Sequence, residues 1–389
     1  MKTLLAVDGN SILNRAFYGI RALSTSSGQP TNAVYGMITM LTRQLEKYSP
    51  DMCAVAFDLR APTFRHKMYD GYKANRKGMP EELAAQMEYA HKVVRALGFH
   101  IIEKEGYEAD DILGTLAAYG DAAGDVQTLI MTGDRDSLQL ISEHTAVLLA
   151  TNTDYVYFDR NAFFEKYGVE PSQFVDVKAI MGDSSDNIPG IAGIGEKGAL
   201  ALISRFGSLN GVYESYESAD GIKPAMLAKL AAGREAAFIS QTLAEICRTV
   251  PDMPILAELE TNGINKEEAK KLFTELEFGA LIKKMGLDSV EVACAAEPSA
   301  ACEYKTESGV DAFLSMLSSE SPAIAMNDTT ATVFDGSRIC SIDVSSTPLD
   351  ALAAAAQPDE VVDIVAALRK KHRGVALVTV CPLASDIGC

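Results

Sequence analysis

Short apolar runs that end at an acidic residue constrain the fold of this chain most strongly. Residues 4–7 precede Asp8, residues 54–57 precede Asp58, and residues 126–131 lead into Thr132-Gly133-Asp134. Runs of this length with an apolar residue at nearly every position are typical of strands buried on both faces of a sheet. Further runs of this kind span residues 99–102 and 146–149.

Helical patterns alternate with these runs. They cover residues 32–47, 81–97 and 108–119, and the second has a proline at its start and Gly98 after its end. Strands that alternate with helices predict an α/β fold with a mostly parallel central sheet. In such sheets, sites form beyond the carboxyl ends of the strands, where Asp8, Asp58 and Asp134 are expected.

Nine carboxylates gather in five short clusters. Like charges a few ångströms apart repel and raise each other's pKa, so such a concentration does not serve stability. Oxygen ligands suit Mg²⁺ or Mn²⁺, and a bound divalent cation relieves the repulsion. The clusters therefore indicate metal-assisted phosphoryl chemistry. The nine residues are Asp8, Asp58, Glu108, Asp110, Asp111, Asp134, Asp136, Asp183 and Asp186.

Each cluster has an ordinary structural explanation when taken alone. Glu108 and Asp111 share the first turn of a helix, where acidic side chains complement the helix dipole. Asp136 could cap a helix, and Asp183 could belong to a polar turn. Five clusters in one chain, three of them at strand ends, are hard to explain as caps. Two metal ions roughly 3.5–4 Å apart could bridge a scissile phosphodiester, with no histidine needed as the base.

Composition limits the environment of the chain. Its 389 residues allow two or three domains, and its seven cysteines are scattered without a CxxC pair. This cysteine usage predicts a reducing compartment without disulfides or a zinc site. The first apolar run is too short for a signal segment and no run reaches transmembrane length, so we expect a cytoplasmic protein without a membrane partner.

A basic segment stands out against the net charge of −18. Residues 60–77 hold six cations and one acidic residue, Asp70, with Tyr69 and Tyr72 between them. A solvated helix face would explain the charges, but aromatic residues between cations suit contact with a nucleic-acid strand. The six cations are Arg60, Arg65, Lys67, Lys73, Arg76 and Lys77.

A glycine-rich segment, Gly190-Ile-Ala-Gly193-Ile-Gly195-Glu-Lys197-Gly198, follows the last acidic cluster. It formally contains GxGxxG, but it follows a polar loop instead of a buried strand, so it is not a dinucleotide fingerprint. We expect a hairpin between helices at about 172–181 and 196–206. Its amides and the following helix N-terminus can hold a backbone phosphate, and its carbonyls could hold a monovalent cation such as K⁺.

These motifs together resemble the 5′ nuclease family, which comprises the N-terminal domain of bacterial DNA polymerase I, phage 5′ exonucleases and flap endonucleases. The resemblance covers about residues 1–290 and is strongest to the bacterial polymerase version. The motifs include Val7-Asp8-Gly9-Asn10, Phe64-Arg65-His66, Gly71-Tyr72-Lys73-Ala74-Asn75-Arg76, Glu108-Ala109-Asp110-Asp111, Asp134-Arg135-Asp136 and Asp183-Ser184-Ser185-Asp186-Asn187.

The resemblance implies a fold and a role for each motif. It implies a PIN-like core over residues 1–160 with a helical arch at about 60–80, and a helix-hairpin-helix-type DNA-binding subdomain over 161–290. One metal ion would be held by Asp8, Asp58, Glu108, Asp110 and Asp111, and a second by Asp134, Asp136, Asp183 and Asp186. Lys73 and Arg76 would grip the scissile phosphate. DNA contacts would come from Arg65, Tyr72, Lys73, Arg76, Lys77, Gly190, Gly193, Gly195 and Lys197.

The implied activity is metal-dependent, structure-specific hydrolysis at 5′ flaps, nicks or 5′ ends of duplex DNA by a two-metal mechanism. RNA in the flap is compatible with this activity, as at primers during replication and repair, and we expect a monomer. Two alternatives differ in class. One is a non-catalytic junction-binding module of a truncated DNA polymerase I. The other is a metal phosphatase, which usually carries Asp-x-Asp on its first strand, whereas Gly9-Asn10 follow Asp8 here.

The remainder of the chain predicts a linker at 291–302 and a small, incomplete α/β unit at 303–389. We expect a helix near 307–318, strands near 323–326, 331–334 and 339–344, a helix near 359–372, and a last strand at 375–380. This unit resembles the start of a 3′–5′ exonuclease-like domain. The strand that would carry its catalytic Asp-x-Glu continues into Asn327-Asp328 without that pair, which predicts an inactive domain.

Overall fold

The computed structural model describes residues 1–76, 78–151, 154–261, 263–290, 305–308, 310–317, 323–326, 330–334 and 338–343. The chain divides into two compact units, Met1–Val292 and Ala293–Cys389. None of the helices in the described ranges is long and apolar enough to cross a membrane. Lys77, the predicted linker at 291–302, Asn327, Asp328 and the elements predicted at 359–372 and 375–380 lie outside the described residues.

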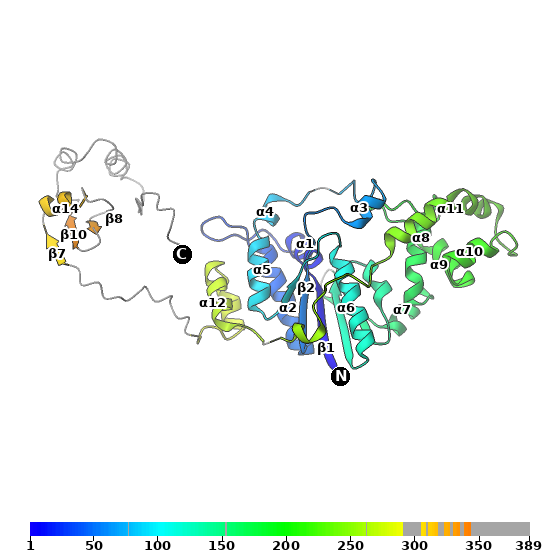
Figure 1. Ribbon diagram of the computed structural model, residues 1–389, viewed down its shortest axis with the longest axis horizontal. Coiled ribbons are helices and arrows are strands. Elements are labelled where there is room, and N and C mark those ends of the chain that lie inside the picture. Colours follow the sequence, from blue (N-terminus) through cyan, green and yellow to red (C-terminus); the bar gives the residue numbers. More distant parts are fainter. Residues whose placement is uncertain are drawn as a thin grey trace. The chain divides into compact units, whose positions relative to one another are not determined.

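A six-stranded sheet forms the centre of the first unit (Figure 1). Its strands are parallel except for the last pair, which confirms the predicted α/β class. In spatial order the strands are β3 (His100–Ile102), β2 (Met52–Ala56), β1 (Lys2–Asp8), β4 (Val126–Thr132), β5 (Thr145–Ala150) and β6 (Tyr155–Phe158).

Both faces of the sheet are covered, which explains the continuous apolar runs. Leu4 and Ala6 on β1 belong to the same apolar cluster as Ile112 of helix α6 (Ala109–Ala123), whereas Leu5 and Val7 belong to the cluster on the opposite face. That second cluster is built with helices α1 (Gly9–Gly19), α2 (Asn32–Tyr48) and α5 (Met87–Ala96). Figure 1 shows α2 and α5 on one side of β1 and β2 and α6 on the other.

The chain order creates a crevice at the carboxyl ends of β1 and β4. After β1 the chain continues to β2 and β3 on one side, and then crosses to β4 on the other side of β1. Neighbouring strands whose connections leave in opposite directions form a topological switch point, where α/β proteins place their sites. Asp8 is the last residue of β1, and Asp134 lies two residues after β4.

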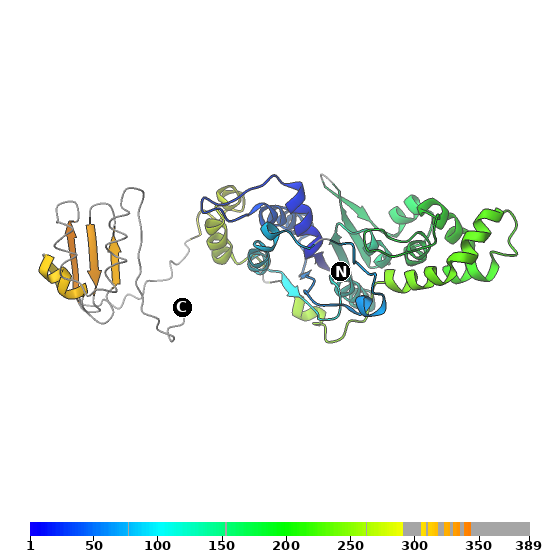
Figure 2. The same ribbon diagram turned by 90° about the horizontal axis from the view of Figure 1, so that it is seen from above.

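Helices from residue 160 to 244 gather at one end of the first unit (Figures 1 and 2). The main helices are α7 (Arg160–Tyr167), α8 (Phe174–Met181), α9 (Glu196–Phe206), α10 (Leu209–Ser215) and α11 (Pro224–Ala244). Helices α8 and α9 flank the glycine segment, as expected. Two short 3₁₀ helices lie earlier in the chain than α8: η1 (Asp136–Leu140) after β4, and η2 (Pro171–Gln173) directly before α8.

Residues 245–290 differ from the expected domain arrangement, because they return to the α/β core. Glu260 forms an isolated bridge with Met52, and helix α12 (Lys266–Glu275) packs on α5. Phe273 and Phe278 belong to the same apolar cluster as α2 and α5. Helix α13 (Gly279–Lys284) follows, and η3 (Leu256–Leu259) lies before α12. Residues beyond Ala244 therefore contribute to the core beside the sheet, within the range predicted for the helical subdomain.

The predicted helical arch at residues 60–80 contains one short helix within its described residues, α3 (Phe64–Met68). The next helix, α4 (Glu81–Ala84), begins after Pro80. Between them the chain forms turns, and Lys73 has a left-handed backbone with φ of 54°. A non-glycine residue in this region interrupts helical geometry, which explains the difference from a continuous helix.

The second unit contains a four-stranded sheet of order β7-β10-β9-β8. The strands are β7 (Lys305–Ser308), β8 (Ala323–Met326), β9 (Thr330–Phe334) and β10 (Arg338–Asp343). Helix α14 (Val310–Leu317) lies between β7 and β8 in the sequence. The predicted helix and three strands are present, and β7 is an additional strand.

Candidate active site

Asp8 lies at the carboxyl end of β1 and also caps helix α1. One carboxylate oxygen accepts a hydrogen bond from the Ser11 amide at 2.9 Å, and the other accepts from the Thr132 hydroxyl at 2.8 Å. The side chain is buried, and this burial raises the pKa of Asp8 to about 7, with the charges of Asp58 and Asp134 acting in the same direction. Asp8 is thus held in place by neutral donors and faces other carboxylates.

Asp58 and Asp110 approach Asp8 from two other elements. Asp58 follows β2, and its carboxylate accepts a hydrogen bond from the Ala109 amide at 2.7 Å, which joins it to the first turn of α6. Burial raises the pKa of Asp58. Burial also raises the pKa of Asp110 well above its usual value, and the nearby charges of Asp134 and Asp8 add to the effect. These carboxylates are close enough to oppose each other's ionisation.

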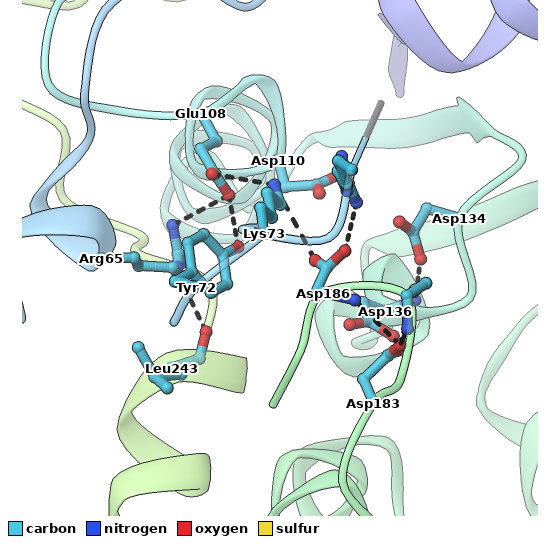
Figure 3. A network of polar contacts seen from close by, with 12 residues as sticks. Arg65, Tyr72, Lys73, Glu108, Asp110, Asp134, Asp136, Asp183, Asp186 and Leu243 are labelled. Carbon is cyan, nitrogen blue, oxygen red and sulfur yellow. Dashed lines mark hydrogen bonds and ion pairs between the residues drawn. The ribbon is translucent and has the colours of Figure 1, made fainter. Parts of the chain in front are cut away.

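Glu108 stands beside them with positively charged partners. Its carboxylate accepts hydrogen bonds from the Lys73 ammonium at 2.8 Å and the Tyr72 hydroxyl at 2.9 Å. Burial alone would raise the pKa of Glu108, but Lys73 and Arg65 outweigh it and lower that pKa. Figure 3 shows this group beside Asp110 and Asp186. Lys73 therefore reaches the predicted metal-binding carboxylates from the arch segment.

Arg65 requires a correction, because it is buried and its donors are already in use. It is 2% exposed, and its guanidinium donates to both oxygens of Asp111 at 2.8 Å. It also donates to the carbonyls of Leu243 at 3.0 Å and Glu245 at 2.6 Å. A side chain with these contacts has no free face for DNA, so the predicted DNA contact of Arg65 is wrong for this structure.

Asp111 is also better explained as a structural residue than as a metal ligand. Besides Arg65, its carboxylate accepts hydrogen bonds from the amides of Glu108 at 3.0 Å and Cys247 at 2.9 Å. The residue is 0% exposed. Four donors occupy both oxygens, and a metal ion would have to displace them.

Tyr72 does not offer its ring to a DNA base in this structure. The side chain is 4% exposed, and its ring lies edge-on to His66 with centroids 5.3 Å apart. Burial raises the pKa of Tyr72, so the hydroxyl remains a hydrogen-bond donor to Glu108. The predicted base-stacking role is therefore replaced by a contact that orients Glu108.

The turn around Lys73 docks on the loop that carries Asp186. The Lys73 amide donates to the Asp186 carbonyl at 2.9 Å, and the Asn187 side chain donates to the Gly71 carbonyl at 2.7 Å. The Arg76 guanidinium forms an ion pair with the Asp186 carboxylate, and Lys73 lies 3.8 Å from the same carboxylate. The structure thus brings Lys73 and Arg76 together with Glu108 and Asp186.

Asp134, Asp136 and Asp183 form a second group around a lysine. The Asp136 amide donates to the Asp134 carboxylate at 2.9 Å. The Lys178 ammonium lies 2.6 Å from Asp136 Oδ1, in an ion pair outside hydrogen-bond geometry, and donates to Asp183 Oδ2 at 2.6 Å. Burial and Asp134 raise the pKa of Asp136 to about 7, whereas Lys178 helps to lower that of Asp183 to about 2 against the effect of burial.

Lys178 was not identified as a site residue from the sequence, although its apolar surroundings indicate a buried lysine. It lies in the apolar helix Phe-Val-Asp-Val-Lys-Ala-Ile-Met, where Val177, Ala179 and Ile180 are all buried. A lysine among buried positions needs an acidic partner. The acidic cluster begins five residues later at Asp183.

Two cavities open at these groups. One of about 380 Å³ is lined by Asp58, Lys73, Arg76, Glu108 and His66, among others. The other, of about 540 Å³, is lined by Asp134, Asp136, Lys178, Asp183 and Ser185, among others. Both are polar sites at the carboxyl end of the sheet.

The chemistry of the donor set fits divalent cations, although the described residues contain no group of three or more His, Cys, Asp or Glu side chains arranged as ligands of one ion. Lysines 73 and 178 and Arg76 lie against several of the carboxylates instead. The donors are all carboxylate oxygens, as Mg²⁺ and Mn²⁺ require. Burial raises the pKa of Asp8 and Asp110, the neighbouring carboxylates add to the effect, and a bound cation would relieve that repulsion.

The glycine segment separates into a packed part and an exposed part. Gly190 is buried with φ of 60°, and a Cβ there would lie 2.3 Å from the Gly182 amide nitrogen, so its role is in packing and its predicted DNA contact is corrected. Gly193, Gly195 and Lys197 are exposed. Gly195 is the N-cap of α9 and provides no side-chain cap, which leaves the first amides of the helix to other acceptors.

Two family models match adjoining parts of the chain. A family model described as "5'-3' exonuclease, N-terminal resolvase-like domain" matches residues 3–168. A second, described as "5'-3' exonuclease, C-terminal SAM fold", matches residues 169–267. The two models adjoin and together cover more than half of the chain.

Curated relatives include DNA polymerase I of Caldicellulosiruptor bescii, 43% identical over 291 residues, which are 74% of this chain and 34% of the relative. DNA polymerase I of Bacillus subtilis is 39% identical over 292 residues, which are 75% of this chain and 33% of the relative. The chain thus spans about a third of the length of these relatives.

Solved structures agree with the fold. The 5'-exonuclease of phage T5 with bound zinc has a TM-score of 0.53 at 23% identity, covering 71% of this chain and 99% of its own. The phage T5 flap endonuclease, in a complex with DNA and metal ions, has a TM-score of 0.54 at 22% identity, covering 71% and 100%. From the two adjoining domain matches, the chain belongs to the 5'-3' exonuclease family of 5′ nuclease enzymes.

Proposed function

We propose that this chain hydrolyses phosphodiester bonds at 5′ flaps, nicks or 5′ ends of duplex DNA and that it depends on a divalent cation. The observation that carries this proposal is the meeting of carboxylates from separate elements at the carboxyl end of the sheet, beside two cations of the arch segment, Lys73 and Arg76. Carboxylates alone would suit many metal enzymes. The adjoining cations suit an anionic polymer such as DNA.

The carboxylates divide into two sets. Asp8, Asp58, Glu108 and Asp110 would hold one metal ion, and Asp134, Asp136, Asp183 and Asp186 would adjoin the second position. Asp111 is left out because its oxygens are occupied. Bound Mg²⁺ or Mn²⁺ supplies Lewis-acid charge and a water of lowered pKa at such a site.

The ion-pair and hydrogen-bond partners of Lys73, Arg76 and Tyr72 indicate their roles. Lys73 and Arg76 neutralise Glu108 and Asp186 in the free chain. When a phosphate enters between them, the same ammonium and guanidinium can donate to its non-bridging oxygens and hold the scissile bond against the carboxylates. Tyr72 keeps Glu108 oriented by its 2.9 Å hydrogen bond.

The exposed glycine segment suits the duplex behind the cleavage point. Gly193, Gly195 and Lys197 lie at the start of α9, where free amides and the positive end of the helix favour a backbone phosphate. We propose K⁺ as a cation for the hairpin carbonyls only where Lys229 does not already supply the charge. The Lys229 ammonium already donates to the Gly193 carbonyl at 2.8 Å and provides positive charge there.

We further infer that the chain acts as a monomer in the cytoplasm, on flaps of DNA or of RNA primers. The phage T5 flap endonuclease has a similar fold and forms a complex with DNA and metal ions, which supports DNA and divalent metal as the partners. The matched relatives are named DNA polymerase I, which supports a role in DNA replication and repair.

The test of this proposal is a comparison of labelled DNA substrates with the purified chain in Mg²⁺. A double-flap junction, a nicked duplex, a blunt duplex and a single strand carry the same 5′ label. We expect a short product from the flap, the nick and the 5′ end of the blunt duplex, and much less from the single strand. Flap binding without any product would favour a non-catalytic junction-binding module.

A further inference from the structure

Lys178 is a buried positive charge between two acidic side chains from different segments. It lies on α8 and is 7% exposed. Its ammonium is 2.6 Å from an oxygen of Asp136, on η1, and 2.6 Å from an oxygen of Asp183, in the loop after α8. A buried ammonium needs such partners, because removing a charge from water without compensation is costly.

The ammonium uses oxygens that a metal ion at this position would need. Mg²⁺ binds oxygen ligands at about 2.0–2.1 Å and tolerates little distortion of its geometry. A dication and an ammonium that share two carboxylate oxygens at these distances would repel each other strongly. The cavity of about 540 Å³ lined by Asp136, Lys178 and Asp183 offers the lysine side chain space in which to move.

Three carboxylates of the other group lack such a partner in the described part of the chain, whereas the fourth, Glu108, pairs with Lys73 and Arg65. Among the residues that the structure describes, no lysine or arginine lies within ion-pair distance of Asp8, Asp58 or Asp110. Asp8 accepts hydrogen bonds from the Ser11 amide and the Thr132 hydroxyl. The two groups therefore differ in how much negative charge lacks a cationic partner. The Asp8 group has more of it and should bind an external cation more tightly.

We propose that Lys178 is a built-in counter-cation of the Asp136–Asp183 pair, which competes with a divalent ion there and causes the Asp8–Asp58–Asp110 group to take up metal first. This inference rests on the divalent-metal dependence proposed above. It makes Lys178 a residue that sets the order and the relative affinity of metal binding. The two acidic groups then differ in metal affinity in the free protein.

Mn²⁺ binding to the full chain without DNA tests this inference directly. Titration followed by electron paramagnetic resonance of free Mn²⁺ counts the bound ions and gives their affinities. For the unsubstituted chain we expect one ion to bind more tightly than a second. In Lys178→Met the second affinity should rise about tenfold or more, since an opposite charge within 4–6 Å changes the proton affinity of a carboxylate by about one to three orders of magnitude.

The control is Lys104→Met, which removes a lysine from an ion pair with Asp252 outside the site. It should leave both Mn²⁺ affinities unchanged. A second affinity that is unchanged or weaker in Lys178→Met would overturn the inference. Flap cleavage is measured separately. Failure of the proposed nuclease function would appear as absent cleavage, whereas the Mn²⁺ affinities would still test the role of Lys178.

If Lys178→Met does not fold, Asp183→Asn tests the order of metal binding instead. This nearly isosteric change leaves the Asp8 group intact. The tightly bound Mn²⁺ should therefore remain, with its affinity unchanged within about twofold, and only the weaker ion should be affected. Loss of the tightly bound ion in Asp183→Asn would show that the Asp136–Asp183 pair fills first, which contradicts the inference.

Discussion

Arg65 and Asp111 form a buried bidentate ion pair in which both nitrogen–oxygen distances are 2.8 Å. The pair joins three parts of the chain. Arg65 belongs to α3 in the arch segment, Asp111 to the first turn of α6 beside Glu108, and the same guanidinium binds the carbonyls of Leu243 and Glu245 at the end of α11. The arch, the carboxylate site and the helical subdomain are thus anchored at one point.

Breaking this pair should destabilise the protein substantially. Arg65→Met leaves the Asp111 carboxylate buried without its partner, a change that typically costs about 3–5 kcal/mol. The matched control, Arg43→Met, removes an ion pair with Asp154 in which both side chains are about half exposed, and should cost no more than about 1 kcal/mol. Urea unfolding of both variants measures the difference. Equal losses would contradict the anchoring role.

Removing the ammonium of Lys73 should impair cleavage more than binding. Lys73→Ala deletes a charge that can stabilise the phosphate in the transition state, and a loss of about 100-fold in the single-turnover rate is typical for one such donor. Flap affinity should fall far less, because other cations contribute to phosphate binding. Lys67→Ala, which changes an exposed lysine on α3, is the control and should retain the rate. Equal loss of rate and affinity in Lys73→Ala would argue against this role.

Strands and acidic positions are predictable from the local sequence pattern to different degrees. Five parallel strands were predicted within one or two residues because apolar residues dominate each run. Strand β6 was not predicted. Val156 and Tyr157 are exposed on this edge strand, so the segment lacks a run of buried apolar residues. The acidic positions were predictable from their places after strands and at helix starts.

The partners of the charged residues were not predictable in the same way. Arg65 and Tyr72 lie in a basic segment that is otherwise largely exposed, and residue type does not reveal that these two side chains turn inward. Asp111 differs from Asp110 only by one position on α6, which points it toward Arg65 and away from the other carboxylates. Contacts over separations such as that from Arg65 to Leu243 become visible only once the chain is folded.

The metal-free chain should become less stable as the pH rises. Asp8 and Asp136 have pKa values raised to about 7, so between about pH 4 and 7 they hold protons in the folded chain that the unfolded chain has lost. Their contribution to stability is present at the acidic side of this window and is lost as the pH rises through it. Mg²⁺ binds the ionised forms, so it should raise the melting temperature more at about pH 8 than at about pH 6.

Differential scanning fluorimetry with and without Mg²⁺ measures this dependence. Asp8→Asn keeps the shape of the side chain without its titration, and should reduce the difference between the two pH values. An equal Mg²⁺ effect at both pH values in the unsubstituted chain would contradict the linkage between protons and metal.

Lys229 should reduce any need for K⁺ at the glycine segment. Because its ammonium donates to the Gly193 carbonyl, duplex affinity should be similar in K⁺ and Na⁺ at equal ionic strength. Lys229→Met exposes that carbonyl, so K⁺ should then support binding better than Na⁺ does. Fluorescence anisotropy with a labelled duplex makes the comparison, and Lys223→Met at the N-cap of α11 is a nearby control. A strong K⁺ preference in the unsubstituted chain would contradict this expectation.

The carboxylates at the end of the sheet are expected to act through a divalent cation in cleaving the flap. The most direct test of this role is single-turnover cleavage of a 5′-labelled double-flap DNA, first in EDTA, then after addition of excess Mg²⁺, with Asp134→Ala measured beside the unsubstituted chain. We predict product only with Mg²⁺, and for Asp134→Ala a loss of at least about 100-fold in rate with nearly unchanged flap binding. Cleavage that persists in EDTA, or that Asp134→Ala leaves intact, would contradict this role.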